Sequence, residues 1–137
     1  MFFKKNKKED EDKNFIKIAS LLIHAAKIDE NFSKIEEKII KEALLKLGAE
    51  NQSLESIIKA GKLMEENANQ ILDFTREVKN MDENKKIQII ETLWQIIYSN
   101  KEADIYETNL MRRLAGLLYV DNKTMGDIKE KIKKKNS

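Results

Sequence analysis

Two short polar turns contain the residues whose types and spacing could do chemistry. Each turn carries oxygen-bearing side chains at its first, third, fifth and eighth positions. Calcium and magnesium are held by several oxygen ligands, so this spacing favours a divalent cation in at least one turn. The candidate ligands are Asp29, Asn31, Ser33 and Glu36 in the turn 29–36, and Glu102, Asp104 and Glu107 in the turn 100–107.

Helix capping is the alternative explanation of the same residues, and we favour it. Ser33 with Glu36, and Asp104 with Glu107, fit the capping box, in which two residues three positions apart exchange hydrogen bonds with free amides at a helix start. The first turn would then hold no ion, and its acidic residues would only begin a helix.

The turns are not EF-hand loops. The sixth position of that loop needs glycine and the twelfth needs a bidentate glutamate. The sixth positions here are Lys34 and Ile105, and the twelfth are Ile40 and Met111.

The composition excludes several other kinds of site. The 137 residues include no cysteine, so no disulfide, zinc–thiolate site or thiol nucleophile is expected. The only histidine, His24, lacks a second histidine beside it, which favours a structural role. Glycine-rich phosphate loops and nucleophile-elbow serines are also missing from the sequence. We therefore expect no catalytic residue and no enzyme, with a carboxylate-based hydrolase left open because nothing selects a pair among the 24 acidic residues.

The charges and hydropathy indicate a globular chain with a strongly solvated surface. Apolar residues make up 41% and charged residues 36%, and no apolar run approaches the roughly 18 residues that cross a bilayer. Residues 1–12 do not resemble a secretory signal, so a cytoplasmic location is expected. The segment 129–135 contains five lysines and one glutamate, a run that we interpret as solvated. We expect no nucleic-acid partner and at most a peripheral membrane contact.

Apolar residues recur at helical spacing along nearly the whole chain and nowhere alternate as in a half-buried strand. The pattern predicts an all-α domain, a single bundle of about seven helices over 14–135, preceded by a flexible charged arm, 1–13. The segment 83–99 is apolar on more than one face and is expected in the centre. Further helix signals are the possible caps Ser53, Asp82 and Thr124, and Gly48 directly after a helix end.

An internal repeat is the most informative pattern. The offset that places Leu22 on Leu93 also places Ser33 on Asp104, Glu36 on Glu107 and Leu47 on Leu118. One offset thus aligns apolar positions and caps without a gap. It predicts two three-helix units, about 14–60 and 85–132, related by a pseudo-two-fold axis and joined by a helix near 68–80.

The second unit resembles the TerB-like family of tellurite-resistance-associated proteins. The resemblance is carried by Leu93-Trp94, by the turn 100–107 and by the Leu-, Arg- and Ala-rich segment 110–120, and the first unit from Ala25 to Gly48 is similar to the family's other half. That family typically has an Asp-Gly turn with a glutamate seven residues after the Asp. Asp29, Glu36 and Glu107 match the acidic positions, whereas Asn100 and Lys101 replace the usual Asp and Gly.

The resemblance implies a duplicated helical domain whose acidic turns have been proposed to bind metal. It also implies a role in stress response, membrane-associated signalling or scaffolding, without an established catalytic activity. We therefore expect a non-enzymatic adaptor that binds a protein partner through a face of the bundle. The alternative is a sensor of calcium or magnesium that works through the turns 29–36 and 100–107.

Overall fold

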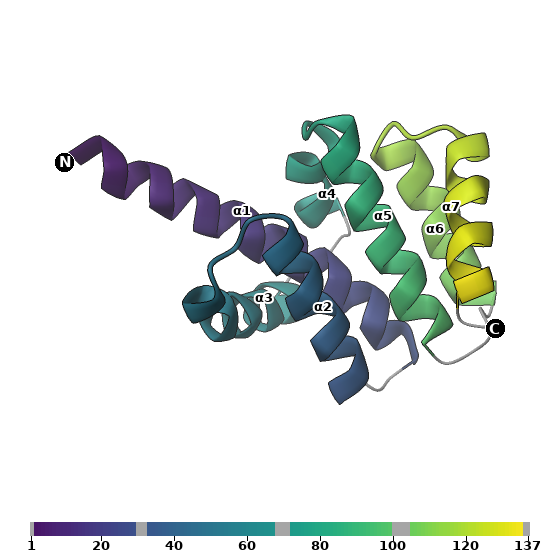
Figure 1. Ribbon diagram of the computed structural model, residues 1–137, viewed down its shortest axis with the longest axis horizontal. Helices are drawn as coiled ribbons and strands as arrows, with labels where there is room; N and C mark the ends of the chain where they lie inside the picture. The colour runs from purple at the N-terminus through teal and green to yellow at the C-terminus, as the bar shows by residue number, and fades with distance from the viewer. Residues whose placement is uncertain (1, 30–32, 68–71, 100–104, 136–137) are drawn as a thin grey trace.

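A computed structural model describes residues 2–29, 33–67, 72–99 and 105–135, and every element in these ranges is helical (Figure 1). The prediction of an all-α bundle of seven helices is confirmed. The helices are α1 (Phe2–Ala26), α2 (Lys34–Lys46), α3 (Leu54–Asn67), α4 (Leu72–Lys79), α5 (Glu83–Tyr98), α6 (Ile105–Leu117) and α7 (Asn122–Lys135), with short 3-10 turns η1 (Lys27–Asp29) and η2 (Asn51–Ser53). Among the described helices, none is both long and apolar enough to cross a membrane.

The central position of α5 follows from its sequence. Apolar side chains leave α5 in several directions, and the helix packs against α1, α2 and α7. Ile89, Ile90, Leu93 and Ile97 are all fully buried in it. Because an α-helix that is apolar around most of its circumference needs neighbours on several sides, α5 separates α2 and α3 from α6 and α7 in Figure 1.

The first helix begins earlier than the apolar pattern suggests. We expect a helix from about residue 14, but α1 starts at Phe2, and its first turns project from the bundle (Figure 1). The segment 4–13 consists mostly of lysine, glutamate and aspartate and has no apolar periodicity. Lysine and glutamate are good helix formers even where nothing is packed against them, so the helix extends beyond its buried stripe.

The ends of α2 and α6, which the repeat places on each other, are built alike. Ala49 N–H donates to the Leu44 carbonyl at 2.9 Å, and Val120 N–H donates to the Ala115 carbonyl at 3.0 Å. In both places the chain turns through a positive φ, +110° at Gly48 and +57° at Tyr119. This is the Schellman ending, and the prediction that a left-handed residue follows Leu47 is confirmed.

The bounds of the two helices also agree with the proposed offset, which carries Lys34–Lys46 onto Ile105–Leu117. The helices are nevertheless packed differently. α2 lies against α1, α3 and α5, whereas α6 lies against α4 and α7. The repeat of local structure is visible, and the pseudo-two-fold relation of two complete units stays a prediction.

The predicted cap of α5 is confirmed, and that of α7 is wrong. Asp82 accepts the Lys85 amide at 2.9 Å. Thr124 does not begin α7, because the helix starts at Asn122 and Asp121 accepts the Thr124 amide at 2.6 Å. The first turn of α7 is polar, so the apolar stripe beginning at Met125 places the start one turn too late.

Candidate functional site

The first polar turn ends in a complete capping box at the start of α2. Ser33 Oγ accepts the Glu36 amide at 3.1 Å, and Glu36 Oε1 accepts the Ser33 amide at 2.9 Å. The Glu36 side chain is buried, only 2% exposed. The capping role predicted for these two residues is therefore confirmed.

Two of the four predicted ligands of this turn belong to the part of the chain that is not fully described. The side chain of Asp29 and all of Asn31 lie outside the described residues, so their distances to Glu36 are not defined. Calcium or magnesium at the turn stays a prediction. The residue after Lys34, Ile35, is 66% exposed beside the box.

The second turn falls largely outside the described part of the chain. Glu102 and Asp104 lie in the gap before α6, and the side chain of Glu107 is likewise not described. Their roles as metal ligands or caps stay predictions. Within the described residues, no group of three or more histidine, aspartate or glutamate side chains is arranged to hold a metal ion.

His24 takes part in an ion-pair cluster that joins α1 to α3. Its Nδ1 lies 3.3 Å from Glu65 Oε1, and Lys27 Nζ lies 2.8 Å from the other oxygen of the same carboxylate. The Phe74 ring of α4 lies 6.1 Å from the imidazole, centroid to centroid. These contacts fit the structural role expected from the sequence.

A second ion pair closes the outer edge between α2 and α3. Lys41 Nζ donates to Glu55 Oε1 at 2.6 Å. This hydrogen bond, with the attraction between the two charges, raises the pKa of Lys41 and lowers the pKa of Glu55. The same two helices bury Ile40, Leu44, Leu54 and Ile58.

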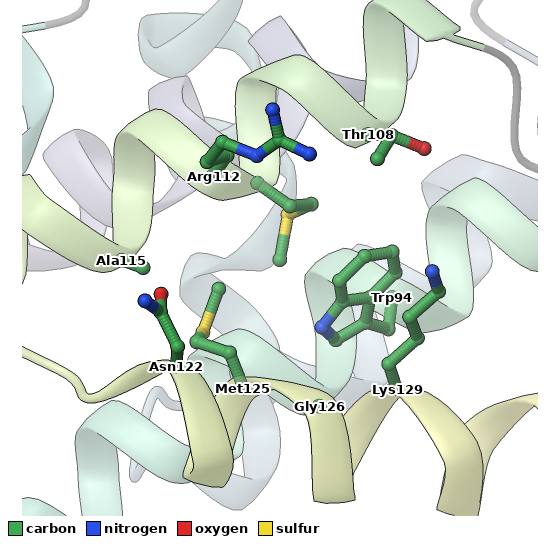
Figure 2. Close-up of a pocket in the computed structure, with 9 residues that line it drawn as sticks. Trp94, Thr108, Arg112, Ala115, Asn122, Met125, Gly126 and Lys129 are labelled. Atoms are coloured by element: carbon green, nitrogen blue, oxygen red, sulfur yellow. The ribbon is translucent and has the colours of Figure 1, made fainter.

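The corresponding region of the second half carries a groove that sequence reasoning missed. It has a volume of about 160 Å³ and is lined from α5, α6 and α7 (Figure 2). Trp94, Met111 and Met125 supply apolar surface, and Arg112 and Lys129 supply positive charge. Each apolar residue fits a helical stripe, so the sequence suggests only core packing for it.

Trp94 is held firmly at the base of the groove. The residue is 3% exposed, and its ring stacks on Tyr98 with centroids 5.9 Å apart. Lys129 Nζ lies 5.5 Å from the indole centroid, within cation–π range. Trp94 Nε1 is buried and has no hydrogen-bond partner, alone among the buried side-chain nitrogen and oxygen atoms of the described residues.

Comparison with known families assigns the chain. A family model described as "Tellurite resistance protein TerB" matches residues 15–130, most of the chain. The chain therefore belongs to the TerB family. No curated protein and no solved structure matches it.

Proposed function

We propose that this TerB-family protein is a non-enzymatic adaptor that binds a protein partner through the outer face of α2. Ile35, Lys38, Glu42 and Leu45 form that face, and all four are exposed. At 100° per residue these positions fall within an arc of about 80°, and the two aliphatic residues stand about 15 Å apart along the axis.

The apolar ends of this face are the observation that carries the proposal. Ile35 is 66% and Leu45 is 42% exposed, although large aliphatic side chains gain free energy from burial. Two such residues on one helix face, with a lysine and a glutamate between them, resemble the anchors of an interface set among polar contacts. The opposite face of α2 is already used, since Ile40, Ala43 and Leu44 are buried.

Capture of a partner by matched variants tests the proposal. Purified protein is immobilised and incubated with an extract of the cells that express it, and the bound proteins are identified and quantified. We expect one stoichiometric partner with the wild type, and its loss in the double variant Ile35→Glu, Leu45→Glu. The control is Leu63→Glu, which changes an equally exposed leucine on α3 and should leave capture intact.

Circular dichroism of both variants confirms that each is folded before capture is compared. A partner that binds the double variant as well as the wild type would contradict docking on α2. Loss of capture in the α3 control alone would move the interface to α3.

A cation-dependent change of the same face is the second candidate function. The capping box holds the Glu36 carboxylate at the turn, and Ile35 lies directly beside it. An ion bound by Asp29, Asn31, Ser33 and Glu36 would therefore act close to the proposed docking face. We expect calcium or magnesium to raise the melting temperature of the wild type and not that of Asp29→Ala. Equal melting curves with and without the ions would contradict this candidate.

A further inference from the structure

Most residues that line the groove between α5, α6 and α7 differ from those that the offset aligns with them, and three of the differences bear on what the groove can bind. Leu44 of the first half corresponds to Ala115, and Glu55 corresponds to Gly126, so the second half has lost side-chain volume at two lining positions. A Cβ built on Gly126 would meet nothing within 4 Å. Ile58 is replaced by Lys129, whose charge now lies over the Trp94 ring.

The groove and the positions of the first half that the offset aligns with it also differ in charge. Lys41 pairs with Glu55 in the first half. Arg112 occupies the position of Lys41, but the position of that glutamate is now Gly126. Among the described residues that line the groove are two cations and no carboxylate. The groove therefore has the charge to receive an anion.

The buried indole supplies a hydrogen-bond donor with no acceptor. Figure 2 shows the indole nitrogen on the ring edge that faces Met125 and Asn122, toward the interior of the groove. An unpaired buried N–H is unfavourable and is relieved by any acceptor that reaches it. Methionine side chains have several rotatable bonds, so Met111 and Met125 can move aside for a ligand and still contact its apolar part.

The size of the groove limits the ligand. An apolar cavity of about 150 Å³ accepts a molecule the size of benzene, whereas sites for drug-sized ligands occupy about 300 Å³ or more. The 160 Å³ here fits a hydrocarbon group of about five or six carbons. We infer that the groove binds a free short-chain carboxylate, with its hydrocarbon against Met111 and Met125 and its oxygens near Trp94 Nε1, Arg112 and Lys129. This site is separate from the outer face of α2.

The test uses the indole signal of Trp94, which is the only tryptophan of the chain. The full-length, ¹⁵N-labelled protein is titrated with 4-methylpentanoate, and the indole N–H cross-peak is followed by NMR. We expect a saturable downfield shift, with a dissociation constant on the order of 1 mM or below. The neutral 4-methylpentanamide and acetate, which lack the charge and the hydrocarbon respectively, should bind at least about fivefold more weakly.

Two variants with a matched control assign the site. Arg112→Gln should raise the dissociation constant about fivefold, and Arg113→Gln, an exposed neighbour outside the groove, should leave it unchanged. Gly126→Glu returns the carboxylate found at residue 55, and it should weaken binding about tenfold or more by filling the groove and pairing with Arg112. The dispersion of the amide spectrum shows that each variant is folded.

Several outcomes would overturn the inference. An indole signal that does not respond at about ten times the expected dissociation constant would do so. Equal shifts with the acid and the amide would show that the charges of Arg112 and Lys129 do not contribute to binding. Equally weakened binding in Arg112→Gln and Arg113→Gln would place the ligand elsewhere. A response to a peptide ending in leucine, without a response to the free acid, would replace the small carboxylate by a protein C-terminus.

Discussion

The helix pairs α1–α3 and α5–α7, which the sequence offset aligns with each other, are packed with side chains of different size. At the contact of α1 with α3, Ala19 lies opposite Gly61, and a Cβ on Gly61 would lie 3.0 Å from the Ala19 Cβ. The residues that correspond to them in the second half, Ile90 and Ile132, are both buried isoleucines. Small residues allow two helix backbones to approach closely, and large residues keep them apart.

The two halves also differ at the groove beside Trp94. In the first half, Gly61 lets α3 lie close against Ala19 of α1, and Lys41 pairs with Glu55 at the surface between α2 and α3. In the second half, the buried Ile90 and Ile132 stand at the positions that the offset aligns with Ala19 and Gly61, and Ala115 and Gly126 line the space beside Trp94. Helices of similar length and with similar ends can thus be packed with different side chains, and the groove beside Trp94 lies among those of the second half.

The largest expected effect on the free energy of unfolding is that of replacing Gly61, which lies at a close helix contact, with alanine. Gly61→Ala places a methyl group against Ala19 and 3.4 Å from the Ser20 backbone nitrogen. Overpacking costs about 1–3 kcal/mol, and the better helix propensity of alanine returns at most about 1 kcal/mol. We therefore expect the free energy of unfolding, measured with urea, to fall by about 1 kcal/mol or more.

Gly126→Ala is the control for this prediction, because a Cβ there meets open space. The same substitution should raise the free energy of unfolding by about 0.5–1 kcal/mol through helix propensity alone. Equal effects of the same sign at the two glycines would contradict the difference in packing.

The second prediction compares the two Schellman turns. Gly48 adopts φ +110°, a conformation that strains any side chain, so Gly48→Ala should lower the free energy of unfolding by about 1–2 kcal/mol. Tyr119 already carries this strain at φ +57°. Tyr119→Gly relieves it but loses the contact with Lys79 Nζ, 4.6 Å from the ring centroid, so a gain of about 0.5 kcal/mol or less is expected.

Thermal and urea unfolding of both variants measure these changes. Two results would contradict a common strain of side chains at positive φ in the two turns. One is a higher free energy of unfolding in Gly48→Ala, and the other is a free energy of unfolding lower by more than about 1 kcal/mol in Tyr119→Gly.

The sequence predicts the helices well because their stripes and caps are local signals. The capping box of Ser33 and Glu36 is encoded within four residues and is present as predicted. The start of α7 was placed at the wrong residue because Asp121 and Thr124 are both good capping residues, and only the polar first turn lies between them.

The groove was not predictable from helix periodicity, because Trp94 and Met111 occupy ordinary core positions of their stripes. A groove depends on what three helices leave unfilled between them, which is a property of packing and not of any one segment. The offset between the two halves does contain a signal. It aligns Glu55 with Gly126 and so shows that a side chain and a charge are missing from the second half.

The third prediction tests whether the capping box is itself repeated. Glu36→Gln keeps a side chain that can still accept the Ser33 amide, so a loss of only about 0.5–1 kcal/mol in the free energy of unfolding is expected. Glu107→Gln should cost the same if the second turn begins α6 in the same way. A loss several times larger at Glu36 would indicate a buried network, and no loss at Glu107 would contradict a repeated box.

The smallest expected effect is the pH dependence of the α7 cap. The hydrogen bonds from Thr124 to Asp121 lower the pKa of this carboxyl below its usual value. A carboxyl with a lowered pKa in the folded state stabilises the protein above its unfolded pKa of about 3.9, and this contribution disappears as the pH falls through the lower, folded value. In Asp121→Asn the asparagine is also a good capping residue, but its side chain does not ionise between about pH 6 and pH 2. Urea unfolding between about pH 6 and pH 2 should therefore show the wild type losing stability relative to Asp121→Asn only below about pH 4. A constant difference across this range would mean that the Asp121 carboxylate is not held by the first turn of α7.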